Sequence, residues 1–317
     1  MKHFDADEVH NLLDYQGLVG ALRELFIMGV DVLARVAYSQ TQKDGTHNHW
    51  IMLPAWQYDN VYGVKLVSVF PKNQDNGLES VQGIYALFDG TNGVPIATID
   101  GAALTLRKTA ANSALAASYL AREDASTLLM VGAGALAPHL IEAHCTVRPS
   151  IKRVRVWNRT LERAVSVVQA ISDKMKIDVE MTTDLEKSVR ESDIITCATM
   201  SSAPLVQGAW LADGAHLDLV GGYQPDMREA DDEAVKRSRV FVDCPSTIEV
   251  CGDVCQPLQS NLIALADIGD TFQLARGERP GRQNPKEVTL FKSGGGGHED
   301  LGTAKYLLTK ANAPTLL

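Results

Sequence analysis

The stretch Leu128-Leu-Met-Val-Gly-Ala-Gly-Ala-Leu-Ala137 decides the fold of this chain, together with Val154-Arg-Val-Trp-Asn-Arg-Thr160 further on. An apolar strand, a glycine turn, a helix and a second strand, in this order, are typical of a dinucleotide-binding site. Gly132 permits the tight turn, and Gly134 has no side chain to keep a pyrophosphate away from the backbone. Ala137 stands where that pattern has its third glycine, at the place where the helix meets the strand. The chain is therefore predicted to contain a Rossmann-type domain.

The residues on either side of this helix indicate the kind of dinucleotide. The helix is expected to begin near Ala135 and Leu136 and to direct its free N–H groups at the phosphates. An NAD site usually has an acid at the end of the second strand, whereas this chain has Asn158, Arg159 and Thr160 there. Arg159 can pair with a 2′-phosphate, which an acid would repel. We therefore predict that these residues bind NADPH, with NADH as the alternative.

The composition sets limits on the class of protein. The chain has 317 residues, enough for two domains, and 45% of them are hydrophobic. Its formal net charge of −9 argues against nonspecific binding to nucleic acid. No apolar run approaches the roughly 20 residues that cross a membrane, and the polar start Met1-Lys-His-Phe-Asp-Ala-Asp-Glu8 is unlike a signal peptide. We therefore expect a cytoplasmic protein with no nucleic-acid and no membrane partner.

Two groups of residues have side chains that can bind metal ions, and we predict no metal site from either. The five cysteines include Cys244, Cys251 and Cys255, whose spacing is not a standard zinc pattern. Buried, inert thiols are the expected state of these residues, because disulfides are rare in the cytoplasm. His47 and His49 would share one face of a strand, but the sequence offers no third ligand beside them. Exposed or substrate-facing side chains are the expected state of this pair.

The periodicity of apolar residues predicts an α/β protein with two kinds of sheet. Residues 8–37 carry helical periodicity, and the strand-like segments that follow are separated by tight turns, which favours an antiparallel sheet. Between residues 122 and 270 strands and helices alternate, as a parallel sheet requires. The predicted strands are Trp50–Leu53, Gly63–Phe70, Gln82–Asp89, Pro95–Asp100, Thr127–Val131, Arg153–Trp157, Ile194–Thr199, His216–Val220, Val240–Val242 and Leu262–Ala264, with a short apolar run at Val288–Phe291; further helices are predicted over Thr109–Leu120 and from His298.

Several charged or strand-end residues could carry chemistry. Lys65 lies inside an apolar strand, so its ammonium needs a partner. That partner is either a carboxylate or imine of a substrate or, if the side chain extends to the surface, water. Arg107 and Lys108 precede the helix predicted from Thr109, where cations interact unfavourably with the positive end of the helix dipole. A bound anion would offset this unfavourable interaction. The glycine run 294–297 before the last helix is either a second anion cradle or a flexible linker. Ligands bind at the carboxyl ends of strands in such sheets, and Thr199, Met200 and Val220 lie at such ends.

Six segments are informative together: Gly63-Val-Lys-Leu-Val-Ser-Val-Phe-Pro71, Asp100-Gly-Ala-Ala-Leu-Thr-Leu-Arg-Lys-Thr-Ala-Ala-Asn-Ser-Ala-Leu-Ala-Ala117, the Gly132 turn, Trp157-Asn-Arg-Thr160, Gly221-Gly-Tyr-Gln-Pro-Asp-Met-Arg-Glu229 and Phe291-Lys-Ser293. In combination they resemble the ornithine cyclodeaminase/mu-crystallin family, and the resemblance covers nearly the whole chain. The resemblance implies a homodimer in which residues 119–289 bind NAD(P) and residues 1–118 with 290–317 form an α+β domain for substrate binding and dimerisation. It places Lys65 on the family's substrate-site lysine, and Thr199, Met200, Val220 and Ser293 on cofactor-contacting positions.

Three departures from the family pattern bear on the activity. Where the cyclodeaminases carry an Asp after the fifth strand this chain has Tyr223, a much weaker base. The family's Arg-Thr-Ala-Ala reads Lys108-Thr-Ala-Ala111 here, with Arg107 one place earlier, so either residue could hold a substrate carboxylate. The region that often supplies another substrate arginine reads His47-Asn-His49.

The resemblance therefore implies an NADPH-dependent ketimine reductase. Its expected substrate is a small cyclic imino acid, either Δ1-pyrroline-2-carboxylate, giving L-proline, or Δ1-piperidine-2-carboxylate, giving L-pipecolate. Lys65, Lys108, Arg107 and Tyr223 are the expected substrate-site residues. Two alternatives stay open: an ornithine cyclodeaminase that uses NAD+ and releases ammonia, and a protein that binds NADPH and a small ligand without turnover. The pathway also stays open between proline, hydroxyproline and lysine metabolism.

Overall fold

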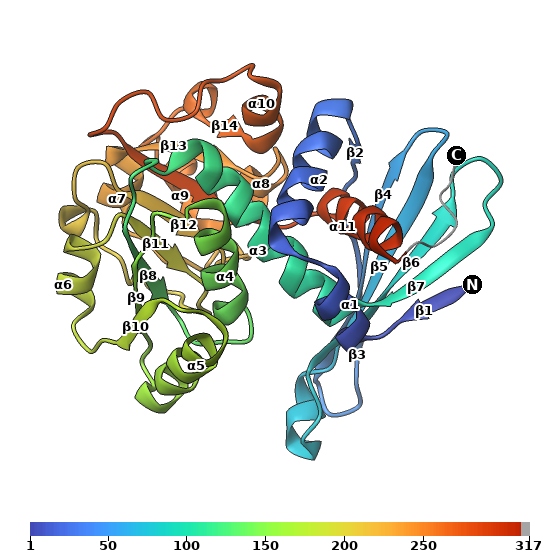
Figure 1. The fold of residues 1–317 in the computed structure, drawn as a ribbon. Helices are drawn as coiled ribbons and strands as arrows, with labels where there is room; N and C mark the ends of the chain where they lie inside the picture. The colour runs from blue at the N-terminus through green and yellow to red at the C-terminus, as the bar shows by residue number, and fades with distance from the viewer. Residues whose placement is uncertain (312–317) are drawn as a thin grey trace. The chain divides into compact units, whose positions relative to one another are not determined.

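The computed structural model describes residues 1–311, and the chain divides into two compact units (Figure 1). The first unit combines Met1–Lys108 with the segment that starts at Gly296, and the second unit is Thr109–Gly295. We predicted domain boundaries at 118/119 and 289/290, which fall inside helix α3 (Gly101–Leu120) and inside strand β15 (Val288–Lys292). The functions assigned to the two predicted domains stay predictions.

The first unit is built on a mostly antiparallel sheet, as the turn-separated strands predicted. Within the described residues, seven strands form it in the order β1-β7-β6-β5-β4-β2, with β3 also paired to β4, and β1 and β7 are the parallel pair. Helices α1 (Ala6–Leu12), α2 (Tyr15–Met28) and α11 (Gly297–Lys310) lie on one face of this sheet, where Phe4, Leu87 and Leu301 are part of one buried core (Figure 1). The strands are β1 (Lys2–Phe4), β2 (Asp31–Val32), β3 (Val36–Thr41), β4 (His47–Gln57), β5 (Val61–Val69), β6 (Val81–Asp89) and β7 (Pro95–Asp100), with a 3-10 turn at Pro71–Asn76.

Two helix boundaries differ from the predicted ones. The helical periodicity predicted over 8–37 ends at Met28, because Gly29 has a φ of 97° and the chain then turns into strands that pair with β4. Helix α3 begins at Gly101 rather than at Thr109, and the side chain of Asp100 accepts a hydrogen bond from Ala103 N at 2.7 Å. Arg107 and Lys108 are therefore the seventh and eighth residues of the helix, beyond its first turn. They do not oppose the dipole at the helix N-terminus, and that prediction was wrong.

The second unit contains a parallel sheet with the strand order of dinucleotide-binding folds. Within the described residues, eight strands form it in the order β10-β9-β8-β11-β12-β15-β13-β14, and the order reverses between β8 and β11. The segment Leu262–Ala264 is not a strand, and β10 and β14 were not predicted. The strands are β8 (Thr127–Val131), β9 (Arg153–Trp157), β10 (Asp178–Met181), β11 (Ile194–Cys197), β12 (His216–Leu219), β13 (Ser238–Val242), β14 (Gly269–Asp270) and β15; the helices after α3 are α4 (Ala137–Val147), α5 (Leu161–Lys174), α6 (Leu185–Arg190), α7 (Asp232–Arg237), α8 (Thr247–Val250), α9 (Gly252–Gln259) and α10 (Thr271–Arg276), with 3-10 turns at Gly208–Trp210 and Leu265–Asp267.

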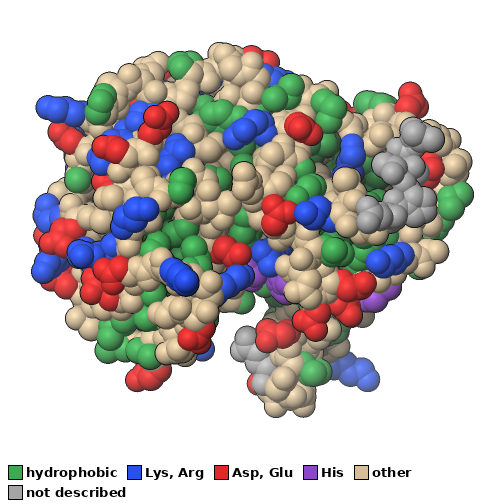
Figure 2. Space-filling model, in the orientation of Figure 1, with side chains coloured by type: hydrophobic (Ala, Val, Ile, Leu, Met, Phe, Trp, Pro, Cys, Tyr) green, Lys and Arg blue, Asp and Glu red, His purple; other side chains and the backbone are tan. Residues whose placement is uncertain are grey.

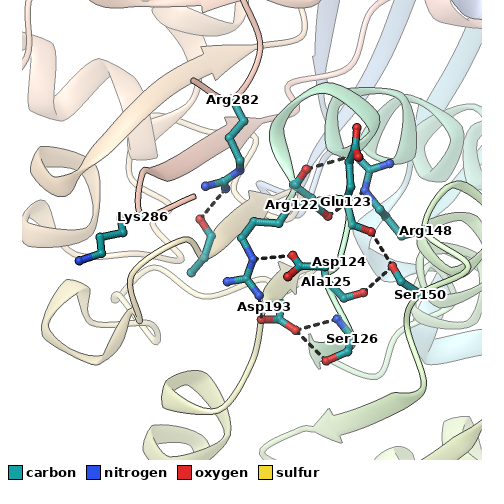
Figure 3. A network of polar contacts seen from close by, with 12 residues as sticks. Arg122, Glu123, Asp124, Ala125, Ser126, Arg148, Ser150, Asp193, Arg282 and Lys286 are labelled. Carbon is teal, nitrogen blue, oxygen red and sulfur yellow. Dashed lines mark hydrogen bonds and ion pairs between the residues drawn. The ribbon is translucent and has the colours of Figure 1, made fainter. Parts of the chain in front are cut away.

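A polar network anchors the start of this sheet to the end of α3 (Figure 3). The guanidinium of Arg148 donates to three carbonyl oxygens at or just beyond the end of α3, and Arg282 Nε donates to a fourth at 2.8 Å, so two cations satisfy the free carbonyls of this helix terminus. Asp193 accepts a hydrogen bond from Ser126 N at 2.7 Å and pairs with Arg122, also at 2.7 Å. These contacts fix the amino end of β8, whose other end carries the glycine turn.

The surface agrees with the acidic, mixed-charge composition. On the face of the described residues drawn in Figure 2, basic and acidic side chains alternate without a large area of one sign. None of the described helices combines the length and the apolar character that would let it cross a membrane.

Candidate active site

A hollow of about 280 Å³ opens at the carboxyl ends of β8, β9 and β11 in the second unit. This is the switch point of the sheet, where parallel α/β sheets bind their ligands. Seven of the predicted cofactor residues line it. They are Gly132, Gly134, Asn158, Arg159, Thr160, Thr199 and Met200, and the other lining residues are Ala133, Trp157, Arg163, Ala198, Ser201 and Leu205.

The glycine turn has the geometry that the sequence required. Gly132 has a φ of 108°, and a Cβ there would lie 2.5 Å from the carbonyl oxygen of Ala198. A Cβ at Gly134 would meet no atom within 4 Å, so a ligand could approach the backbone on that side. The helix begins at Ala137 rather than near Ala135, with Leu136 as its N-cap and no side-chain cap on its N–H groups. The turn therefore presents backbone donors to an anion.

The basic edge of the hollow contains a second arginine that we did not predict. Arg163 lies in the first turn of α5, four residues after Arg159, and it lines both this hollow and a neighbouring one beside Ala135. Among the described residues, neither guanidinium forms a hydrogen bond or an ion pair. Asn158 Nδ2 donates to Thr160 O at 2.8 Å and shapes the turn before α5. The signal available in the sequence was a second basic residue only four positions after Arg159.

In the first unit, Lys65 is buried and paired with an acid of the same chain. The side chain of this β5 residue is 8% exposed, and Nζ lies 2.9 Å from Asp300 Oδ2 and 3.3 Å from Thr105 Oγ1. Burial lowers the pKa of Lys65, while the charge of Asp300 raises it in part. The prediction that this lysine needs a partner is confirmed, and the partner in this structure is a protein carboxylate.

Lys108 and Arg107 also have partners within the chain. Lys108, 3% exposed, lies 2.5 Å from Glu299 Oε2. Arg107 Nη2 donates to His10 O at 2.7 Å, and its guanidinium stacks 4.9 Å from the ring centroid of Tyr15. The adjacent acids Glu299 and Asp300 at the start of α11 thus neutralise two lysines from other elements. Sequence analysis missed both acids, because acids in a first helical turn are common for local reasons.

The register of the first sheet brings one further cation toward Lys65. Leu53 of β4 is paired with Lys65, and the β3–β4 pairing begins with Val36 opposite Met52. Arg35 directly precedes β3, and continuing the β3–β4 register by one residue would set it opposite Leu53. It is exposed and has no ion pair among the described residues. The segment 47–49, where the family often has another substrate arginine, lies one strand further along the chain.

The glycine run 294–297, which we predicted to be either an anion cradle or a flexible linker, is bound in part by a carboxylate of the chain itself. Gly294 N and Gly295 N donate to Asp243 Oδ2 at 2.8 and 2.6 Å. Ser293 is buried, and its N–H donates to Leu219 O at 3.0 Å. This run therefore fixes the segment after β15 to the core of the second unit.

The remaining predicted residues lie outside the hollow described above. Tyr223, 40% exposed, follows β12, and Val220 N donates to Cys197 O at 2.8 Å. His47 and His49 each share a hydrogen bond with a hydroxyl group of β3, at 3.2 and 2.9 Å. Among residues 1–311, no group of three or more His, Cys, Asp or Glu residues is arranged to hold a metal ion. The five cysteines are free thiols, four of them buried.

The sheet order, the glycine turn and the hollow at the switch point define a Rossmann-type nucleotide-binding protein. The chain belongs to the ornithine cyclodeaminase/mu-crystallin family, whose model matches residues 7–314. It is 40% identical to the Δ1-pyrroline-2-carboxylate reductase of Paracoccus denitrificans over 255 residues, 80% of each chain. It is also 40% identical to the protein SAR DEFICIENT 4 of Arabidopsis thaliana over 264 residues, 81% of each chain. The predicted family resemblance is confirmed.

A solved structure extends this similarity to the fold. The Δ1-pyrroline-2-carboxylate reductase of Thermococcus litoralis, in complex with NADH and L-proline, matches 98% of both chains with a TM-score of 0.90 and 29% identity. The predicted α/β class with a Rossmann-type sheet is therefore confirmed.

Proposed function

We propose that this protein is an NADPH-dependent reductase of a small cyclic imino acid. The substrate is Δ1-pyrroline-2-carboxylate, with L-proline as the product, or the six-membered Δ1-piperidine-2-carboxylate, with L-pipecolate as the product. The observation that carries the proposal is the 40% identity with the Paracoccus denitrificans reductase over 80% of both chains. The buried, paired Lys65 and the basic hollow supply residues that such a reaction needs.

The residues of the hollow fit a nicotinamide dinucleotide. Gly132 and Gly134 leave the backbone open to a pyrophosphate, and Thr199 and Met200 form the wall after β11. Arg159 and Arg163 would bind the 2′-phosphate, which favours NADPH over NADH. When bound, the reduced nicotinamide supplies the hydride that the imine carbon accepts.

Lys65 and Arg35 would hold the substrate. The carboxylate of the imino acid needs a cation whose charge is not already balanced, and Arg35 meets that requirement. Lys65 would direct an N–H at the imine nitrogen and deliver a proton there, so that C=N becomes CH–NH as the carbon accepts a hydride. Asp300 keeps Lys65 in place during this step through its 2.9 Å contact. Lys108 would support the site through its pair with Glu299, and Tyr223 would contact the substrate.

One face of the first sheet supports a homodimer. Register places Val36, Tyr38, Trp50, Tyr62 and Ile84 on the face opposite Lys65, and each is at least 38% exposed. An apolar face of this kind marks a protein–protein contact. We propose that a second copy of the chain covers it. The cytoplasmic location stays a prediction.

The experiment that tests the activity follows the absorbance at 340 nm with purified protein, Δ1-pyrroline-2-carboxylate, and NADPH or NADH in parallel. Rapid oxidation, faster with NADPH, is expected. A flat trace together with ammonia release from L-ornithine and NAD+ would favour the cyclodeaminase, against which Tyr223 argues. NADPH binding without turnover of any cyclic imino acid would leave a ligand-binding protein.

A further inference from the structure

A single buried acid, Glu229, joins the loops that follow two adjacent strands of the parallel sheet. Its side chain is fully buried. Oε1 accepts hydrogen bonds from Thr199 N at 2.7 Å and from Thr199 Oγ1 at 2.9 Å, and Oε2 accepts one from Gly221 N at 2.7 Å. Thr199 follows β11 and Gly221 follows β12. One carboxylate therefore bridges the two strand ends next to the switch point.

The two loops are in direct contact at this place. A Cβ at Gly221 would lie 2.0 Å from the carbonyl oxygen of Thr199. The backbone of Glu229 adds a second attachment, because its carbonyl oxygen accepts from Leu205 N at 2.9 Å. Thr199 and Leu205 both line the hollow, so residue 229 holds the wall segment 199–205 at each of its ends.

Glu229 is itself fixed by a buried ion pair. Asp253 Oδ1 accepts from Glu229 N at 2.8 Å, and Asp253 Oδ2 lies 3.4 Å from Lys292 Nζ. All three side chains are fully buried. Burial raises the pKa of Glu229, and the charge of Lys292 opposes that rise. Burial of the Glu229 carboxylate costs desolvation free energy, which favourable contacts must offset. Here these contacts come from groups at strand ends.

We propose that Glu229 is a positioning residue for the cofactor, acting through Thr199 and Gly221 without touching the cofactor. The inference rests on the proposed function, since it assumes that the hollow holds a nicotinamide dinucleotide. The carboxylate keeps the wall after β11 and the turn after β12 at a fixed separation, so that the hollow is already shaped before the cofactor binds. Preorganisation of this kind increases affinity, because the loops need not be ordered on binding.

The test compares Glu229→Gln with Asp231→Ala, which removes the acceptor of two backbone N–H groups, in the full chain. An amide in place of the Glu229 carboxylate has one acceptor oxygen, so either Thr199 N or Gly221 N loses its partner. Asp231 is the matched control, because its carboxylate also accepts from two backbone N–H groups, Gly208 and Ala234, both at 2.8 Å. Neither of those groups belongs to the hollow. The readouts are the Kd of NADPH, from quenching of tryptophan fluorescence, and the thermal midpoint.

We expect both variants to lower the thermal midpoint, but only Glu229→Gln to raise the Kd of NADPH, by about tenfold, since one hydrogen bond to a charged group is lost. An unchanged Kd in Glu229→Gln, with binding by the wild type, would overturn the inference and leave the proposed function intact. Absence of NADPH binding by the wild type would overturn the proposed function itself. Should Glu229→Gln not fold, hydrogen exchange on the wild type decides: slow exchange of the Thr199 and Gly221 amides without cofactor is expected, and fast exchange contradicts the inference.

Discussion

Replacing Asp300 by Asn tests whether the buried pair with Lys65 governs both the stability and the chemistry of the first unit. The two side chains are 0% and 8% exposed, and their charged atoms lie 2.9 Å apart. Removing one partner of a buried pair leaves an uncompensated charge, which costs about 3–5 kcal/mol. We expect Asp300→Asn to lose a free energy of unfolding in this range at neutral pH, measured by urea denaturation.

The loss in the free energy of unfolding should depend on pH, and the direction of that dependence follows from the pKa of Lys65. Burial already lowers the pKa of Lys65 from its usual 10.5, and Asp300 opposes the shift, so the variant should lower that pKa further. Below the folded-state pKa, Lys65 is charged in both the folded and the unfolded chain, and the whole cost is present. Above it, the folded chain binds fewer protons than the unfolded chain, and stability rises with pH. The deficit of the variant relative to the wild type should therefore narrow as the pH rises toward 10.5, over the range in which Lys65 is neutral in the folded variant and still charged in the folded wild type.

A surface pair supplies the control for this experiment. Lys174 and Glu142 are 2.7 Å apart, with side chains 53% and 23% exposed. Glu142→Gln should cost at most about 1 kcal/mol, with little dependence on pH in this range. If Asp300→Asn costs no more than Glu142→Gln, the buried pair does not stabilise the unit as argued. We also expect the Kd of NADPH to stay unchanged in Asp300→Asn, because the hollow is formed by other residues.

Three further predictions concern the two sites and the apolar face. Lys65→Ala should reduce kcat by about a hundredfold or more, because a positioned proton donor contributes on the order of that factor. The Kd of NADPH should be unchanged, and loss of NADPH binding would contradict the role of Lys65. In titrations, Arg159→Ala and Arg163→Ala should each weaken NADPH binding by about tenfold and leave NADH binding nearly unchanged. Equal losses of affinity for both cofactors would show that neither arginine binds a 2′-phosphate. Trp50→Glu should shift a dimer toward the monomer in analytical ultracentrifugation, and a wild type that sediments as a monomer would refute the proposed interface.

The sequence by itself determined the parts of this protein that depend on local chain geometry. The Gly132 turn needs a positive φ, and its neighbours alternate between strand and helix, so the parallel sheet and its ligand-binding edge could be predicted from one segment. Arg159 could likewise be assigned to the hollow, because its place at the end of β9 follows from the same pattern. The prediction failed where the local sequence was ambiguous, as at the start of α3. The apolar residues of its first turns show no periodicity that distinguishes them from the preceding strand.

Only the tertiary structure decided how the charges of the site are balanced. Lys65 and Asp300 are separated by 235 positions, and Glu229 reaches Thr199 across 30, distances over which no pattern in the sequence links an acid to its partner. Each of these acids could have been a surface residue or a helix cap in a different fold. Packing removes them from water, and a charge without water needs a specific partner at hydrogen-bond distance. Which lysine meets which acid is therefore a property of the folded chain.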